Sequence, residues 1–132
     1  MSTSLGRVMV VDDSKTIRDL ISMNLELEGY DVVTAADAQE CLDHLAEVAA
    51  GLVPMPQLLM LDVVMPGLDG VELTARLKAT PATAAVPILI VSASAQRRDF
   101  ELARGAGADG YLTKPFDPDD LLTEVARLIL PA

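Results

Sequence analysis

The chain has 132 residues, of which 51% are hydrophobic and 23% charged, with a mean hydropathy of +0.35. This length and composition predict one folded domain with a single substantial core, and they exclude an intrinsically disordered protein. With 20 acidic residues against 10 basic ones, the net charge of −10 argues against non-specific binding to DNA or to anionic membranes.

The N-terminal sequence MSTSLGRVMVVDD becomes acidic before any long apolar segment, so it lacks the form of a secretory signal. No segment approaches the ~20 apolar residues that a membrane helix needs. The single cysteine, Cys41, has no partner for an intramolecular disulfide and is expected to be a small packed residue on a helix. We therefore expect a cytoplasmic protein.

Short apolar segments alternate with helical patterns along the chain. Strands are predicted at 7–12, 30–34, 58–62, 88–92 and 110–113. Helices are predicted at 14–29, 37 to about 50, 70–79, 96 to about 104, and from 117 onward. Ser14 and Asp117 are suited to cap the first and last helices, and Gly29 is suited to end the first.

This (βα)5 order predicts an α/β fold, namely a doubly wound open parallel sheet with helices on both faces. The expected strand order is 2-1-3-4-5, in one domain over residues 1–132. In such sheets the ligand site lies beyond the carboxyl ends of the strands, where the winding reverses direction. Here that point lies between the first and third strands.

Polar residues stand at the carboxyl ends of these predicted strands. Asp12 and Asp13 end the first strand, Asp62 the third and Ser92 the fourth, and Lys114 follows the fifth. Neighbouring strands lie roughly 5 Å apart, so three carboxylates are expected to converge and to raise one another's pKa values. Mg²⁺ would neutralise them and leave room for phosphate oxygens, and a carboxylate is able to form an aspartyl-phosphate. Asp62, at the switch point, is the best candidate nucleophile.

Four stretches in this order carry a family resemblance: VMVVDDS (8–14), LDVVMPGLDG (61–70), VSAS (91–94) and GADGYLTKPF (107–116). Together they resemble the response-regulator receiver domain of bacterial two-component signalling over essentially the whole chain. The resemblance implies that Asp62 is the phosphoacceptor. It also implies that Asp13 binds Mg²⁺ directly, that Asp12 reaches the metal through water, and that the Val64 carbonyl completes the protein's ligands.

The same resemblance assigns the switch residues. Ser92 would hydrogen-bond the phosphoryl group, Lys114 would pair with it, and Tyr111 would turn inward on activation. The Lys114–Pro115 bond is expected to be cis. The readout surface would consist of the fourth helix, fifth strand and fifth helix. The donor would be a sensor histidine kinase or phosphotransfer protein, and the downstream partner is not specified by the sequence.

Simpler structural roles also exist for these residues. Asp12 and Asp13 could cap the first helix, Ser92 could be a turn residue, and Tyr111 could be ordinary packing. His44, the sole histidine, is expected to face solvent far from the strand ends. Val64 and Ser94 flank the phosphorylation site, and because neither is suited to position water, we expect slow loss of phosphate.

Other functions fit the sequence less well. A small phosphohydrolase with an aspartyl-phosphate intermediate, like the haloacid dehalogenases, needs a second acid two residues after its nucleophile, where this chain has Val64. A flavodoxin-like nucleotide or flavin module would have a glycine-rich loop after the first strand. A receiver that no longer takes phosphate would have lost site residues. The sequence therefore favours a regulatory phosphoacceptor with no enzymatic activity beyond its own phosphorylation and dephosphorylation.

Overall fold

The structure is a computed structural model that describes residues 4–129, and it confirms the predicted alternation of strands and helices. The elements are β1 (Arg7–Val11), α1 (Lys15–Glu28), β2 (Asp31–Ala35), α2 (Ala38–Ala49), β3 (Leu58–Asp62), α3 (Gly70–Lys78), β4 (Ile88–Ser92), α4 (Arg97–Gly105), β5 (Gly110–Thr113) and α5 (Pro118–Ile129).

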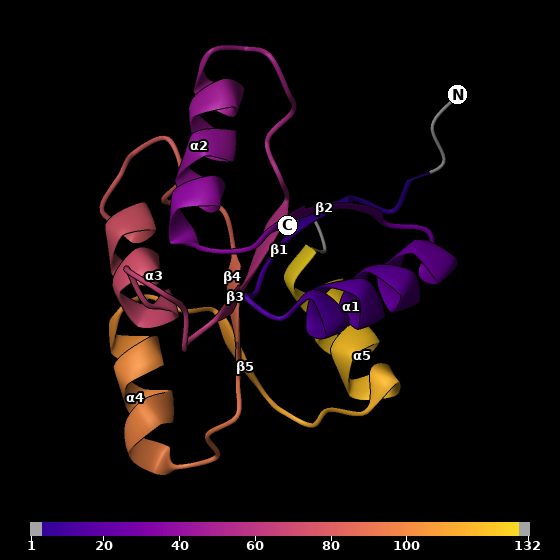
Figure 1. Ribbon diagram of the computed structural model, residues 1–132, viewed down its shortest axis with the longest axis vertical. Helices are drawn as coiled ribbons and strands as arrows, with labels where there is room; N and C mark the ends of the chain where they lie inside the picture. The colour runs from indigo at the N-terminus through magenta and orange to yellow at the C-terminus, as the bar shows by residue number, and fades with distance from the viewer. Residues whose placement is uncertain (1–3, 130–132) are drawn as a thin grey trace.

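The strands form one five-stranded sheet in the order β2-β1-β3-β4-β5, and every neighbouring pair is parallel. Helices α1 and α5 cover one face, and α2, α3 and α4 cover the other (Figure 1). The predicted doubly wound fold and strand order are therefore confirmed. The direction of winding reverses between β1 and β3, so this is the switch point.

Each face of the sheet has its own hydrophobic core. Beneath α1 and α5 the helices contribute Ile21, Leu25, Leu121 and Val125. Beneath α2, α3 and α4 they contribute Ala38, Cys41, Leu45, Leu73, Leu77 and Ala103. Strands β3 and β4 are buried along their whole length because helices cover them on both sides, which explains their unbroken apolar sequences.

Strands β3, β4 and β5 have the predicted bounds, whereas the other elements differ by one residue at one or both ends. Local hydrogen bonds explain the difference at β2. Gly29 adopts a left-handed φ of 115° and ends α1 as predicted, and the Tyr30 N–H then donates to the Leu25 carbonyl at 3.0 Å. Tyr30 thus belongs to the helix end, and β2 begins at Asp31 and runs on to Ala35, which pairs with Val11. The predicted caps form: Ser14 Oγ accepts from the Ile17 N–H, and Asp117 Oδ1 from the Asp119 N–H.

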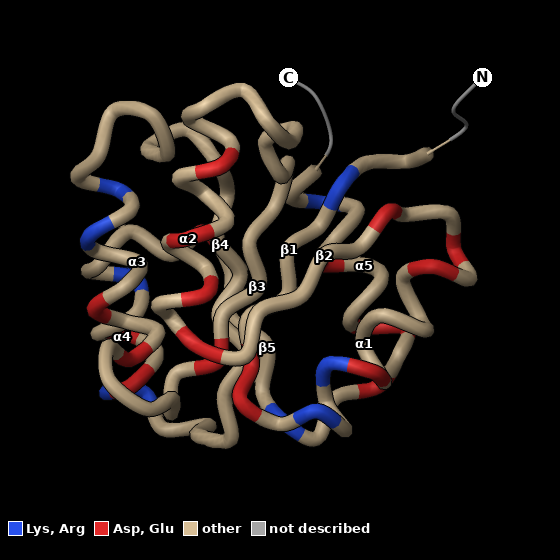
Figure 2. The backbone as a smooth tube through the Cα atoms, turned by 45° about the horizontal axis from the view of Figure 1, so that its top comes forward, with Lys and Arg blue, Asp and Glu red and all other residues tan. Residues whose placement is uncertain are grey.

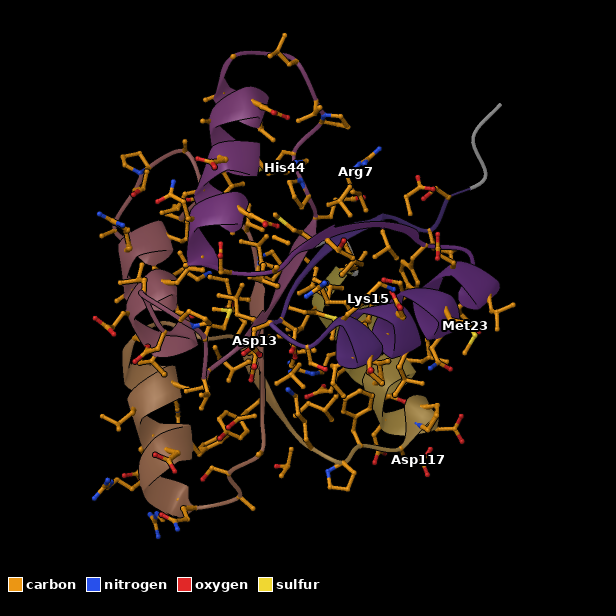
Figure 3. The ribbon with its side chains drawn as sticks, viewed as in Figure 1. Arg7, Asp13, Lys15, Met23, His44 and Asp117 are labelled. Atoms are coloured by element: carbon orange, nitrogen blue, oxygen red, sulfur yellow. The ribbon has the colours of Figure 1, made fainter. Side chains whose placement is uncertain are left out.

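Charged residues lie in the helices and at the strand ends, while the interior of the sheet is uncharged (Figure 2). Cys41 is buried as expected. His44, expected to face solvent, is half-buried instead, and its Nε2 atom is covered without a hydrogen-bond partner. It lies on α2, well away from Asp13 (Figure 3). None of the described helices is long and apolar enough to cross a membrane.

Candidate functional site

The predicted polar residues come together at the carboxyl edge of the sheet. Parallel register aligns Val11 with Leu61, Asp62 with Val91, and Ser92 with Thr113, so the residues that end these strands share one edge. Oxygen atoms of Asp12, Asp13 and Asp62 lie within 4.8 Å of one another. The convergence expected from the strand order is present, and Asp13 lies between the two groups of helices in Figure 3.

Lys114 reaches this group from the end of β5. Its Nζ atom lies 2.8 Å from Asp12 Oδ2 and 3.3 Å from Asp62 Oδ1. The Asp12 and Asp62 side chains are only 3% and 9% exposed, whereas Asp13 is exposed. One lysine therefore pairs with two buried carboxylates while a third lies at the surface, and the site keeps a surplus of negative charge.

The loop after β1 fixes the position of Asp12. Asp12 Oδ1 accepts from the Ser14 N–H at 2.9 Å, and the Asp12 carbonyl accepts from Arg18 Nη1 at 2.7 Å. Asp12 thus helps to bond the start of α1, in line with its simpler role as a helix cap. Its second carboxylate oxygen accepts a hydrogen bond from Lys114 Nζ. The two roles coexist in one side chain.

The loop after β3 fixes Asp62 through a close backbone approach. A Cβ atom built on Gly70 would lie 2.2 Å from the Asp62 carbonyl oxygen, and the Gly70 N–H donates to the Val63 carbonyl at 3.0 Å. Only glycine fits at this contact. Asp69 caps α3 by accepting from the Glu72 N–H, so the loop that follows β3 ends at a capped helix start.

Burial and neighbouring charge shift the pKa values of the site. Burial raises the pKa of Asp62, the charge of Asp12 raises it further, and Lys114 opposes the rise. Burial alone would lower the pKa of Lys114, but its hydrogen bond to Asp12 and the charge of Asp62 outweigh burial and raise it. Lys114 is therefore held as an ammonium ion, and a carboxylate at Asp62 is held at some electrostatic cost.

The donor set fits a small divalent cation. Three carboxylates within 4.8 Å, one of them exposed and the other two sharing a single lysine, offer hard oxygen ligands and unbalanced negative charge. Mg²⁺ prefers one or two protein carboxylates, with its other positions left to water or phosphate oxygens. Val64, 76% exposed, lines the same cleft as Asp13 and Asp62.

That cleft has a volume of 620 Å³ and runs from the acidic group to the space between α3 and α4. Its walls also include Ser92 and Lys114. Two apolar residues, the half-buried Val71 and the exposed Leu102, line it as well. Five of its lining residues are acidic, namely Asp13, Asp62, Asp69, Glu72 and Asp99. It is large enough to hold a phosphoryl group and its donor side chain.

The predicted switch residues lie on two sides of the β4–α4 loop. Ser92 is 4% exposed, and its Oγ accepts from the Ser94 N–H at 3.1 Å. Tyr111 does not line the cleft; its hydroxyl donates to the Ser94 carbonyl at 2.8 Å, and its ring meets Phe100 edge-on. The Lys114–Pro115 bond is cis, as the resemblance implies.

The sequence reasoning missed three residues around the site: Arg18, Gly70 and Asp99. A glycine directly after the Asp69 cap was a usable signal for close backbone approach, because glycine is otherwise a poor first residue for a helix. The contacts of Arg18 and Asp99 depend on how loops fold back, and no spacing rule predicts them.

Comparison with known proteins gives matches over nearly the whole chain. Residues 8–126 match the family model described as the response regulator receiver domain. The chain is 38% identical over 125 residues to the DNA-binding dual master transcriptional regulator RpaA of Synechocystis, covering 95% of this chain and 49% of RpaA. It is 38% identical over 123 residues to the alkaline phosphatase synthesis transcriptional regulatory protein PhoP of Bacillus subtilis, covering 93% and 48%. The chain spans about half the length of these curated relatives.

Solved structures resemble the fold closely. A putative response regulator from Chloroflexus aurantiacus superposes with a TM-score of 0.86 at 31% identity, covering 94% of this chain and 97% of that one. The chemotaxis protein CheY4 of Vibrio cholerae superposes with a TM-score of 0.83 at 31% identity, covering 95% and 99%. These matches extend over both faces of the sheet.

Proposed function

The chain belongs to the response-regulator receiver family, and we propose that it is a phosphorylation-controlled switch in which Asp62 accepts the phosphoryl group. One observation carries this proposal: Asp62 lies at the switch point with two further carboxylates within 4.8 Å and the Lys114 ammonium at 3.3 Å. Convergent charged groups at such a point serve a site rather than the core. The unit we propose is a single receiver domain over residues 1–132.

The proposed reaction moves a phosphoryl group from a histidine of a sensor kinase or phosphotransfer protein. A carboxylate oxygen of Asp62 attacks phosphorus, a P–O bond forms, and the P–N bond breaks with its electron pair leaving on the imidazole nitrogen, which is then protonated. Lys114 offsets the charge on the transferring oxygens. Asp12, Asp13, Asp62 and the Val64 carbonyl would hold Mg²⁺, which when bound supplies further positive charge to those oxygens.

The proposed output is a shift between two arrangements of the α4, β5 and α5 surface. Ser92 would donate to the new phosphoryl group, and the β4–α4 loop and Tyr111 would follow it. The downstream partner is a protein or an attached effector domain. RpaA is named as DNA-binding, but a chain with a net charge of −10 that spans half of it is poorly suited to contact DNA directly.

The proposal is tested by incubating the protein with a small phosphodonor and Mg²⁺ and measuring intact mass. We expect the wild type to gain one phosphoryl group that alkali removes, and Asp62→Asn to gain none. Asp69→Asn is a matched control because Asp69 lines the same cleft and asparagine caps helices as well as aspartate. Equal labelling of Asp62→Asn and wild type would refute the proposal.

Slow loss of phosphate stays a prediction of the same experiment. Val64 is apolar and Ser94 already donates its hydroxyl to Asp99, so neither group is placed to activate a water molecule. Following the labelled mass after removal of the donor measures the lifetime. A lifetime of seconds would contradict the prediction.

A further inference from the structure

Ser94 connects the phosphate-binding edge to the readout surface, and every one of its polar atoms is used. Its N–H donates to Ser92 Oγ at 3.1 Å, and its carbonyl accepts from the Tyr111 hydroxyl at 2.8 Å. Its Oγ donates to Asp99 Oδ2 and accepts from the Gln96 N–H. One residue thus contacts the end of β4, the side chain of β5 and the first turn of α4.

The start of α4 is bonded differently from the starts of α1, α2 and α3. Helices α1, α2 and α3 each begin with a side-chain cap, from Ser14, Asp37 and Asp69. The α4 cap residue, Gln96, makes no such bond. Ser94 Oγ instead accepts from the Gln96 N–H just before the helix, and the Asp99 carboxylate fixes the direction of that hydroxyl.

Asp99, which is half-buried, also faces the acidic cleft. It lines the same cleft as Asp62 and Lys114. Among the residues that line this cleft, five are acidic and Lys114 is the only basic one. Phosphorylation would replace the single negative charge of Asp62 by about −2. Added negative charge at Asp62 disfavours a second carboxylate that faces the same cleft.

We propose that Asp99 is a positioning residue that, through Ser94, holds the start of α4 in the arrangement without a phosphoryl group. Phosphorylation at Asp62 weakens the Asp99–Ser94 contact in two ways: by repulsion across the cleft, and by drawing Ser92, and with it the Ser94 N–H, toward the new phosphoryl oxygens. The inference rests on the proposed function. In it, Asp99 stabilises the state of the switch that carries no phosphoryl group.

Two variants test it, with a control on the same helix. Ser94→Ala removes the donor and keeps the charge, while Asp99→Asn removes the charge and keeps an acceptor oxygen. Glu101→Gln removes an equal charge from an exposed residue of α4 that pairs only with Arg97. The probe is beryllofluoride with Mg²⁺, a phosphoryl mimic, and the readouts are NMR signals of Tyr111 and of the β4–α4 loop.

Without the mimic, we expect both variants to shift these signals along the line that joins the free and mimic-bound wild type. The apparent Kd for beryllofluoride should fall about tenfold in Ser94→Ala, the size expected from losing one charge-assisted hydrogen bond that favours the resting state. Glu101→Gln should match the wild type in both readouts. If Ser94→Ala fails to fold, the milder Asp99→Asn variant decides the matter alone.

Signals that stay at the wild-type position, or an affinity that is unchanged or reduced in both variants, would overturn the inference. A contact that is only structural would lower the free energy of unfolding without tightening the mimic. If the wild type itself neither binds the mimic nor accepts phosphate at Asp62, the proposed function fails and this inference with it. If the wild type does both and the variants match it, only the role of Asp99 is refuted.

Discussion

The two ends of the same sheet each hold a lysine beside a carboxylate, but only one end balances its charges. At the amino end, Lys78 Nζ donates to Asp109 Oδ2 at 2.9 Å and to the carbonyls of Val86 and Ala84 at 2.9 and 3.3 Å. Asp109 Oδ2 also accepts from the Ile88 N–H at 2.8 Å. All three ammonium donors and the facing carboxylate oxygen are satisfied, so this cluster joins α3, β4 and β5 without residual charge.

At the carboxyl end, Lys114 is covered to the same extent as Lys78, each being 19% exposed. Here the lysine faces Asp12 and Asp62 together, and Asp13 lies within reach of both acids. The same residue types therefore give a structural contact at one edge and a charge surplus at the other. A charge surplus that the fold does not neutralise is the reason we propose this edge as the one that binds a cation and phosphate.

Replacing each lysine by methionine should separate the two ends most clearly. Lys114→Met leaves two buried carboxylates without their cation, and we expect it to lower the free energy of unfolding by about 3 kcal/mol. Lys78→Met leaves Asp109, which is 40% exposed and keeps its bond from Ile88, so a loss of about 1 kcal/mol is expected. Urea unfolding monitored by circular dichroism measures both.

Magnesium should distinguish the same two variants. Mg²⁺ supplies positive charge where Lys114 was removed, so it should restore part of the stability of Lys114→Met and none of that of Lys78→Met. If Mg²⁺ changed the stability of both variants equally, the two ends of the sheet would not differ in cation binding as described here.

The backbone contact beneath Asp62 gives the next largest effect. Gly70→Ala forces a Cβ atom to within 2.2 Å of the Asp62 carbonyl oxygen, so the chain must move, and we expect a loss of about 2 kcal/mol. Phosphorylation by the small donor should slow in parallel because Asp62 moves. Gly105→Ala, in α4 with open space around the added atom, is the matched control and should be neutral or slightly stabilising. A neutral Gly70→Ala would contradict this account of the loop.

Removing the negative charge of Asp62 should raise the free energy of unfolding. The pKa of Asp62 is raised by burial and by Asp12, so the folded protein holds this proton more tightly than the unfolded chain, and stability falls as the pH rises through that titration. Asp62→Asn should therefore gain about 1 kcal/mol at neutral pH without Mg²⁺. The gain should vanish in acid, where the wild type is protonated in both states. If Asp62→Asn were less stable than the wild type at neutral pH, the negative charge of Asp62 would not be destabilising the fold.

The reactivity of the Cys41 thiol gives the smallest expected effect. It tests whether the lost stability of Lys114→Met reflects unfolding of the whole domain or local opening of α2. Burial raises the pKa of its thiol to about 12, and the side chain is fully covered beneath α2, so the folded wild type should react very slowly with thiol reagents at pH 8. The reaction should accelerate in Lys114→Met only as far as its global unfolding increases. Fast labelling of the stable wild type would show local opening of α2 instead.

Most of the fold was predictable because each element carries a local signal. Unbroken apolar segments predicted β3 and β4, and Ser14, Gly29 and Asp117 marked helix ends that the structure confirms. The convergence of Asp12, Asp13, Asp62 and Lys114 followed from strand order alone, since parallel strands bring their carboxyl ends to one edge.

Other features were not predictable because they depend on tertiary contacts. Tyr30 was placed in a strand, but its N–H completes the end of α1. His44 was expected at the surface, but the helix orientation half-buries it. The bond from Ser94 to Asp99 crosses a loop whose path no periodicity reports. The strand ends could be placed from the sequence, whereas the side-chain partners of the β4–α4 loop could not.

The central claim is that Asp62, among three crowded carboxylates, is the one that accepts the phosphoryl group. The most direct test is to phosphorylate the wild type, reduce the acyl phosphate with borohydride, and locate the resulting homoserine by peptide mass spectrometry. We expect conversion at position 62 alone, with Asp12 and Asp13 unchanged. Conversion at position 12 or 13, or at an acid outside the cleft, would contradict it.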